Sequence, residues 1–187
     1  MKNLPNILSV FRIFASITML VFMVIINPVE NRNLFVLLPG IIFVLGCFSD
    51  FLDGKIARHY NVVSDFGKFI DPIGDKILTF FAMLGFIFVG ADKGFPFMLI
   101  AISATLLREF TISSVRMMSA TKGTVVAANI LGKIKTVSQM VSLISYFVLI
   151  ETEHMIIAQI LLSISVVFTI VSGANYVKGF FELMKNK

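Results

Sequence analysis

The sequence predicts an all-α integral membrane protein, in which six transmembrane helices form one bundle with a polar site at its cytoplasmic end. Two properties of the composition indicate this class: 57% of the 187 residues are hydrophobic, and only 14% are charged. Soluble domains carry about 25% charged residues, so this chain cannot cover a normal solvated surface. The third observation is a series of long apolar runs, each close to the ~20 residues that cross a bilayer. Little of the chain remains outside them, and we expect one membrane domain over residues 1–187.

Six apolar runs follow one another with short connections. The first, Ile7–Ile26, is too long for the apolar region of a signal peptide, and no small-residue cleavage site follows it. The second run ends with charged residues, and the third begins with them. The later runs are Leu34–Ala57, Phe66–Val89, Phe95–Met118, Ile134–Ile150 and Met155–Tyr176, and residues 178–187 form a basic end. Short connections between antiparallel neighbours are typical of helical bundles.

The basic residues predict the orientation of the bundle. If the amino terminus faces the cytoplasm, all sixteen Lys and Arg residues except Arg32 and Lys93 fall at or near the inner side. The outer connections instead carry acidic residues. Because cytoplasmic loops of membrane proteins are enriched in Lys and Arg, both termini are expected in the cytoplasm.

Four aspartates interrupt the apolar pattern within or beside the second and third predicted helices, where charge is costly. At 3.6 residues per turn, Asp50 and Asp53 lie ~60° apart on their helix, and Asp71 and Asp75 lie ~40° apart. Each pair therefore shares one helix face, and consecutive antiparallel helices can bring the two faces together. Converging carboxylates repel one another unless cations bind between them, and oxygen ligands suit Mg²⁺ or Mn²⁺. We therefore expect a divalent metal site at the cytoplasmic end.

Other interpretations of the aspartates stay open from the residues alone. Helix capping explains Ser64 or Asp65, but not the four aspartates, which lie away from a helix start. A cation pathway should place ionisable residues through the whole membrane, whereas the outer halves of these helices are apolar. A structural salt-bridge cluster could instead use the neighbouring basic residues Lys55, Arg58, Lys68 and Lys76.

The segment from Asp50 to Asp75 reads D-x2-D-G-x2-A-R-x8-G-x3-D-x3-D. This pattern resembles the signature of the CDP-alcohol phosphotransferase family at every defined position. The resemblance continues outside the signature. The opening Asn3-Leu4-Pro5-Asn6 with Ser9 and Arg12, the group around Arg108-Glu109-Phe110, and the segment Leu131–Thr136 are similar to bacterial members that use glycerol 3-phosphate.

The resemblance implies a bacterial plasma-membrane enzyme with six transmembrane helices, usually a homodimer, and two divalent cations at a cytoplasmic site. It implies transfer of the phosphatidyl group of CDP-diacylglycerol to an alcohol, with release of CMP. Asp50, Asp53 and Asp71 correspond to metal ligands. Asp75 corresponds to a ligand that also serves as the base for the acceptor hydroxyl. The residues that would shape the CDP pocket are Gly54, Ala57, Arg58 and Gly67.

The signature defines the donor and leaves the acceptor open. Basic residues gather at the cytoplasmic junction of the fourth and fifth helices, where an anionic acceptor could bind: Arg108, Arg116, Lys133 and Lys135. Guanidinium groups bind phosphate through two hydrogen bonds, although positive-inside topology or anionic lipid headgroups could also explain these charges. Arg108 lies about two turns inside its predicted helix and needs a partner. Glu109 follows it directly and should point elsewhere, because residues i and i+1 do not share a helix face.

Glycerol 3-phosphate is the acceptor that this basic group favours. Transfer to serine or inositol phosphate is the first alternative, because the signature itself does not distinguish acceptors. A divalent-cation transporter is the second alternative, because the aspartates alone would also suit that function.

Overall fold

The computed structural model describes residues 4–26, 30–49, 65–89, 95–121, 130–150 and 152–185. Within these ranges the elements are helices, with no strand. They are α1 (Leu4–Ile25), α2 (Arg32–Phe35), the π-helical turn η1 (Val36–Gly40), helical residues 41–49, α4 (Asp65–Val89), α5 (Phe95–Thr121), α6 (Ile130–Leu149) and α7 (Met155–Lys185). The all-α prediction is therefore confirmed for the described part of the chain.

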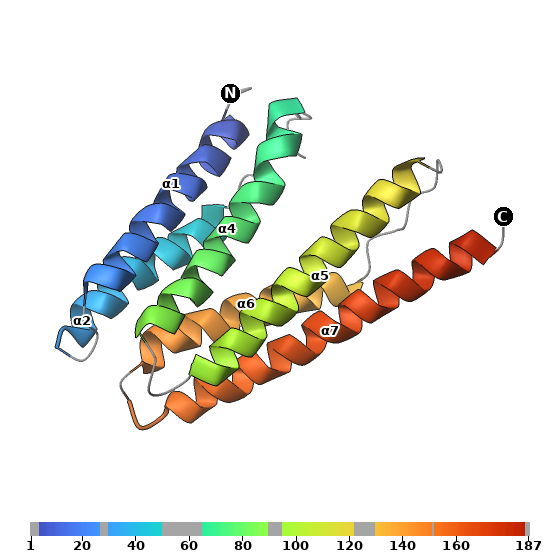
Figure 1. Ribbon diagram of the computed structural model, residues 1–187. Coiled ribbons are helices and arrows are strands. Elements are labelled where there is room, and N and C mark those ends of the chain that lie inside the picture. Colours follow the sequence, from blue (N-terminus) through green and yellow to red (C-terminus); the bar gives the residue numbers. More distant parts are fainter. Residues whose placement is uncertain are drawn as a thin grey trace.

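The helices pack in two groups that share one core. Helix α1 lies along α4, while α7 lies along both α5 and α6, and α4 contacts α5 between the groups (Figure 1). The start of α1 and the end of α7 lie toward the same end of the bundle, together with the start of α4 and the end of α5 (Figure 1). We call this end of the bundle the polar end, because the charged groups described below lie toward it.

Four helices of the described part are long and apolar enough to cross a membrane. Their apolar segments are Asn6–Ile25, Pro72–Val89, Pro96–Ser119 and Met155–Lys185. The helical run Asn33–Ser49 is also apolar but shorter than these four. Length and composition therefore indicate an all-helical membrane protein.

Two predicted helix boundaries were wrong. Helix α6 begins at Ile130, four residues before the predicted start, and α7 continues to Lys185 instead of ending at Tyr176. The basic end of the chain keeps the helical pattern, because Phe180 is buried while Lys178 and Glu182 form an exposed ion pair one turn apart. Amphipathic spacing of this kind extends a helix past its apolar segment.

The second apolar run contains a π-helical turn that the sequence analysis did not predict. Pro39 lies inside this turn and has no N–H to donate, and the N–H of Ile41 reaches the carbonyl oxygens of both Leu37 and Leu38. A π turn is a common way for a helix to absorb such an interruption. Gly40 follows, and a side chain there would start 3.5 Å from Cβ of Phe147.

The apolar core lies away from the polar end and is dominated by aromatic rings. The ring centroid of Phe86 is 4.6 Å from that of Phe147 and 5.3 Å from that of Tyr146, and Phe43 lies 5.6 Å from Phe147. Phe86 follows Asp75 by about three turns of α4. This packing fills the bundle interior with apolar groups beyond the charged region, which disfavours a cation pathway through the described part.

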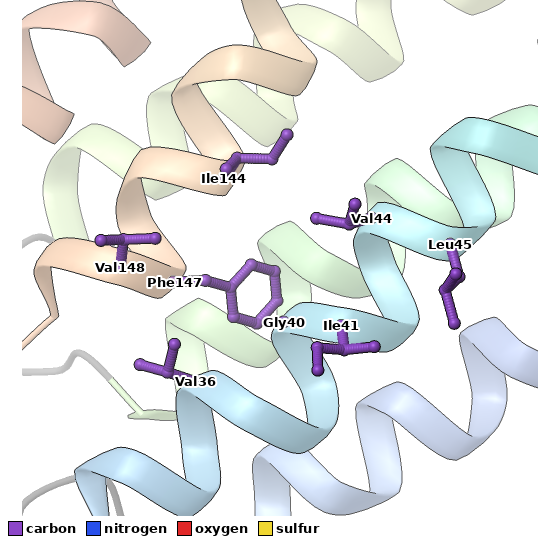
Figure 2. Close-up of a pocket in the computed structure, with 8 residues that line it drawn as sticks. All are labelled: Val36, Gly40, Ile41, Val44, Leu45, Ile144, Phe147 and Val148. Atoms are coloured by element: carbon purple, nitrogen blue, oxygen red, sulfur yellow. The ribbon is translucent and has the colours of Figure 1, made fainter.

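An apolar groove of about 230 Å³ lies beside this core, between the π turn with its following helix and α6 (Figure 2). It is lined by Val36, Gly40, Ile41, Val44, Leu45, Ile144, Phe147 and Val148. These side chains carry no polar group, so the groove offers nothing that could bind phosphate or a metal ion.

Small residues bring the helices close together. A Cβ on Gly46 would lie 2.7 Å from Cδ2 of Leu78, and one on Gly85 would lie 2.4 Å from Sδ of Met23. A Cβ on Gly74 would lie 3.4 Å from the carbonyl oxygen of Ser9. Close backbone approach at small residues is a common packing mode of membrane helices. It sets the spacing between α4 and its neighbours, on which the charged groups depend.

Candidate active site

Helix α4 positions the predicted acidic residues that the structure describes. The helix runs without a break through Asp71 and Asp75, so the two residues lie one turn apart on one face, as their spacing predicts. Gly67, one turn before Asp71, is buried. The side chain of Asp71 is not among the parts of the chain that the structure describes. The predicted site residues Asp50, Asp53, Gly54, Ala57 and Arg58 also lie outside the described residues. The four-aspartate site therefore stays a prediction.

Asp75 lies against a buried arginine of α1. Arg12 donates through Nη1 to Oδ1 of Asp75 and through Nε to Oγ of Ser49, at 3.3 Å. The Arg12 side chain is completely buried, whereas that of Asp75 is 45% exposed. Ser49 precedes Asp50 directly, so Arg12 joins α1, α4 and the helix that leads into the first predicted aspartate pair.

Lys76, the next residue of α4, takes part in a second group of charges. Its Nζ lies 3.2 Å from Oε2 of Glu109, while Oε1 of Glu109 lies 2.5 Å from Nη1 of Arg108 and 3.5 Å from Nζ of Lys135. We call Lys76, Arg108, Glu109 and Lys135 the Glu109 cluster. It carries three positive charges and one negative charge, contributed by α4, α5 and α6.

Three of the four side chains of the Glu109 cluster are largely shielded from solvent, and that of Lys76 is not. The side chains of Lys135, Arg108 and Glu109 are 8%, 15% and 17% exposed, and that of Lys76 is 41% exposed. One turn beyond Lys135, the buried Gln139 donates to Oγ1 of Thr105 at 3.2 Å. A short polar layer therefore separates the charges from the apolar core.

Arg108 is fixed by two further elements. Its Nε donates to Oγ of Ser172 on α7 at 3.1 Å, and its Cγ lies 3.2 Å from the position of a Cβ on Gly173. Its Nη2 lies beside Gly132 of α6, where an added Cβ would approach to 3.4 Å. Two glycines thus allow the guanidinium to lie between α6 and α7.

The four predicted acceptor residues are only partly brought together. Arg108 and Lys135 meet at Glu109. Arg116 lies about two turns along α5 from Arg108, where its Nε donates to the hydroxyl of Tyr176 at 3.3 Å. Its guanidinium carbon also lies 5.9 Å from the centre of the Tyr176 ring. Lys133 is exposed on α6.

The prediction for Glu109 was wrong in one respect. Glu109 does pair with Arg108, its neighbour in sequence, because the arginine side chain is long enough to bring Nη1 within 2.5 Å of Oε1. Its additional partners on α4 and α6 agree with the expectation of a partner elsewhere.

Neither Arg12 nor Lys76 was predicted to be a residue of the active site. A charged residue in the middle of an apolar run was the available signal for Arg12, because such a residue needs a partner inside the bundle. Nothing in the spacing identified Asp75 as that partner.

Among the described residues, no group of three or more His, Cys, Asp or Glu side chains could hold a metal ion. The carboxylates of Asp50, Asp53 and Asp71 lie outside the described part, so this finding does not test the convergence of the four aspartates. The described site therefore has one half-exposed carboxylate, Asp75, next in sequence to Lys76 of a cluster with excess positive charge.

Long apolar helices with a cluster of charges between them define a helical membrane protein. Comparison with known proteins gives its family. The chain belongs to the CDP-alcohol phosphatidyltransferase family, whose model matches residues 2–171. It is thus an enzyme of the phosphatidyl-transferring class.

Several similar proteins have the same name. The CDP-diacylglycerol–glycerol-3-phosphate 3-phosphatidyltransferase of Bacillus subtilis (strain 168) is 34% identical over 197 residues, covering 99% of this chain and 98% of the relative. The enzyme of that name from Rickettsia typhi is 35% identical, with 95% and 97% coverage. A probable phosphatidylglycerophosphate synthase of Mycobacterium tuberculosis is 30% identical over 73% of this chain and 62% of the relative.

Proposed function

We propose that this protein transfers the phosphatidyl group of CDP-diacylglycerol to glycerol 3-phosphate, giving phosphatidylglycerophosphate and CMP. The observation that carries the proposal is the position of Asp75 and Lys76 as consecutive residues of α4. Asp75 lies beside Arg12 and the helix that leads into Asp50, whereas Lys76 contacts the Glu109 cluster. A site for the donor phosphates and a cationic site for the acceptor phosphate would then be neighbours. The names of the near-full-length relatives support the same reaction.

The proposed metal site uses the four aspartates of the signature, Asp50, Asp53, Asp71 and Asp75. The described residues fit such a site, because Asp71 and Asp75 lie one turn apart in α4 and the Asp75 carboxylate is half-exposed. Carboxylate oxygens suit two divalent cations, Mg²⁺ or Mn²⁺. When bound, such cations neutralise the pyrophosphate and stabilise the departing CMP. The residues proposed to shape the CDP pocket are Gly54, Ala57, Arg58 and Gly67.

Asp75 is the proposed catalytic base. Its carboxylate takes the proton from the acceptor hydroxyl, while the hydroxyl oxygen forms a bond to the phosphorus of the phosphatidyl group. The bond from that phosphorus to the CMP oxygen breaks, and CMP leaves with the electron pair. Arg12 holds Asp75 from the α1 side, which orients the carboxylate.

The proposed acceptor site holds the phosphate of glycerol 3-phosphate. Arg108 and Lys135 of the Glu109 cluster are its central groups, and Arg116 and Lys133 lie farther out along α5 and α6. Guanidinium and ammonium groups form charge-assisted hydrogen bonds with phosphate, and these are about twice as strong as neutral ones. Serine has no phosphate to fill such a site, so this charge favours a phosphorylated acceptor.

The proposed architecture is a single domain over residues 1–187 with six membrane crossings. Four crossings would be the long apolar helices. The other two would be α6 and the run Asn33–Ser49, extended to Ala57 as the sequence predicts. Both termini and the active site would face the cytoplasm of a bacterium from its plasma membrane. The distribution of Lys and Arg supports this orientation, as does the position of the start of α1 and the end of α7 at one end of the bundle (Figure 1). The family resemblance also supports a homodimer.

The decisive experiment is an acceptor screen with the purified protein in detergent–lipid micelles. CDP-diacylglycerol and Mg²⁺ or Mn²⁺ are supplied with labelled glycerol 3-phosphate, serine or inositol phosphate, and the lipid product and CMP are measured. We expect phosphatidylglycerophosphate and CMP in equal amounts with glycerol 3-phosphate alone. A preference for another acceptor would make the protein a sister enzyme. Metal flux into liposomes without turnover of CDP-diacylglycerol would instead indicate a transporter.

A further inference from the structure

Glu109 is a shielded carboxylate that the proposed reaction does not use. We propose that Glu109 is a positioning residue that holds the side chains of Lys76, Arg108 and Lys135 together as a preformed site for the phosphate of the acceptor. The inference rests on the proposed function and deepens it, because it assigns the group that organises the acceptor site.

The three cations come from three different helices. Without an anion between them they would repel one another, and their long side chains would turn toward water or lipid headgroups. Glu109 contacts Arg108 and Lys135 through Oε1 and Lys76 through Oε2, so both of its oxygens are used. One carboxylate therefore sets the relative positions of three donors.

The charge of the cluster points to a ligand and not to a purely structural salt bridge. Glu109 neutralises one of the three positive charges and leaves a net charge of +2 in a cluster whose Arg108 and Lys135 side chains are only 15% and 8% exposed. Buried charges are expensive unless they are paired. A phosphate monoester near neutral pH carries between one and two negative charges with three acceptor oxygens, and it complements this excess.

The described contacts use only part of the hydrogen-bond donors of the cluster. Arg108 is held through Nε by Ser172 and through Nη1 by Glu109, while Nη2 lies beside Gly132. Glycine at this position has no side chain to cover Nη2. Arginine has five N–H donors and lysine three, so each cation can donate to Glu109 and to a phosphate oxygen at the same time.

The test compares E109Q and E109D with the wild-type enzyme. The kcat and KM are measured for glycerol 3-phosphate and for CDP-diacylglycerol, and inorganic phosphate is titrated as a competitive inhibitor against the acceptor. We expect E109Q to raise the KM for glycerol 3-phosphate and the inhibition constant of phosphate by about tenfold or more, the effect of losing a charge-assisted hydrogen bond. The KM for CDP-diacylglycerol should change less than about twofold, because the donor binds elsewhere. E109D should recover part of the loss.

The control is E182Q, which removes an exposed carboxylate paired with Lys178 on α7. Its kinetic constants should equal those of the wild type. The second variant, K135Q, should raise the acceptor KM by itself. The double variant E109Q/K135Q should then show less than the product of the two effects, because Glu109 acts through Lys135.

The inference is overturned if E109Q leaves the acceptor KM unchanged or raises the KM of both substrates equally. It is also overturned if the acceptor KM of E109D is as high as that of E109Q. If the wild-type enzyme turns over glycerol 3-phosphate and the variants give any of these results, only the role of Glu109 is refuted. A wild-type enzyme that uses serine would refute the proposed function and this inference together. With inositol phosphate as the acceptor, the proposed function fails and the same comparison decides the role of Glu109.

Discussion

Replacement of Arg12 should destabilise the bundle, because this residue joins three helices while being completely buried. Its guanidinium contacts Asp75 and Ser49 through different nitrogen atoms. Breaking a buried ion pair by removing one partner costs about 3–5 kcal/mol. The Asp75 side chain is 45% exposed, so water can partly solvate the carboxylate that loses its partner. We therefore expect R12M, which keeps much of the volume, to cost about 3 kcal/mol, at the low end of that range.

R12K keeps the charge but has a single nitrogen, which cannot occupy both positions of the guanidinium. It should cost about 1 kcal/mol, the value of one hydrogen bond. In a protein of this size, each kcal/mol lowers Tm by roughly 2–4 °C. The expected losses are therefore roughly 6–12 °C for R12M and 2–4 °C for R12K on the same scale.

The assay is thermal unfolding of the purified protein in one detergent, followed by far-ultraviolet circular dichroism. The control is F14L, because Phe14 is an apolar residue of the same helix with 64% of its surface exposed. Exposed substitutions of this kind usually stay within about 0.5 kcal/mol. A Tm of R12M within about 2 °C of the wild type, or equal losses in R12M and R12K, would refute the reasoning.

The remaining predictions concern packing and chemistry. G85A should cost about 1–3 kcal/mol, because the new methyl group would overlap Met23, whereas G179A has nothing within 4 Å and should gain about 0.5–1 kcal/mol. Equal Tm changes in the two variants would contradict this packing. D75N should abolish turnover while keeping some binding of metal and CDP-diacylglycerol, and wild-type rates would exclude Asp75 as the base. R116A should raise the KM for the acceptor more than that for the donor, and an unchanged acceptor KM would place the phosphate away from Arg116. Chelation of divalent cations should stop turnover, and Mg²⁺ or Mn²⁺ should restore it. Full activity after chelation would contradict the metal site.

Local patterns predicted much of the fold. The third and fourth apolar runs agree with α4 and α5 within a few residues, because a continuous apolar run of sufficient length defines a membrane helix without reference to its neighbours. The end of α7 was less predictable, because amphipathic spacing after an apolar segment is a weaker signal. The π turn around Pro39 was missed because a proline can be accommodated in a helix in several ways.

Local patterns likewise predicted only part of the candidate site. The positions of Asp71 and Asp75 on one face of a helix follow from the period of the helix alone. The basic residues of the fourth and fifth helices were recognised by type, but only Arg108 and Lys135 meet. Arg116 instead contacts Tyr176 of α7, about two turns farther along α5 than Arg108.

By itself, the sequence determined that the chain is an apolar helical protein, which residues share a helix face, and which family signature those residues form. These properties depend on composition and on a period of a few residues. Only the tertiary structure decided that Arg12 pairs with Asp75 across 63 residues of chain, and that one glutamate collects cations from three helices. The physical reason is that charged side chains are long and accept many partners, so the packing of the helices selects which of them meet.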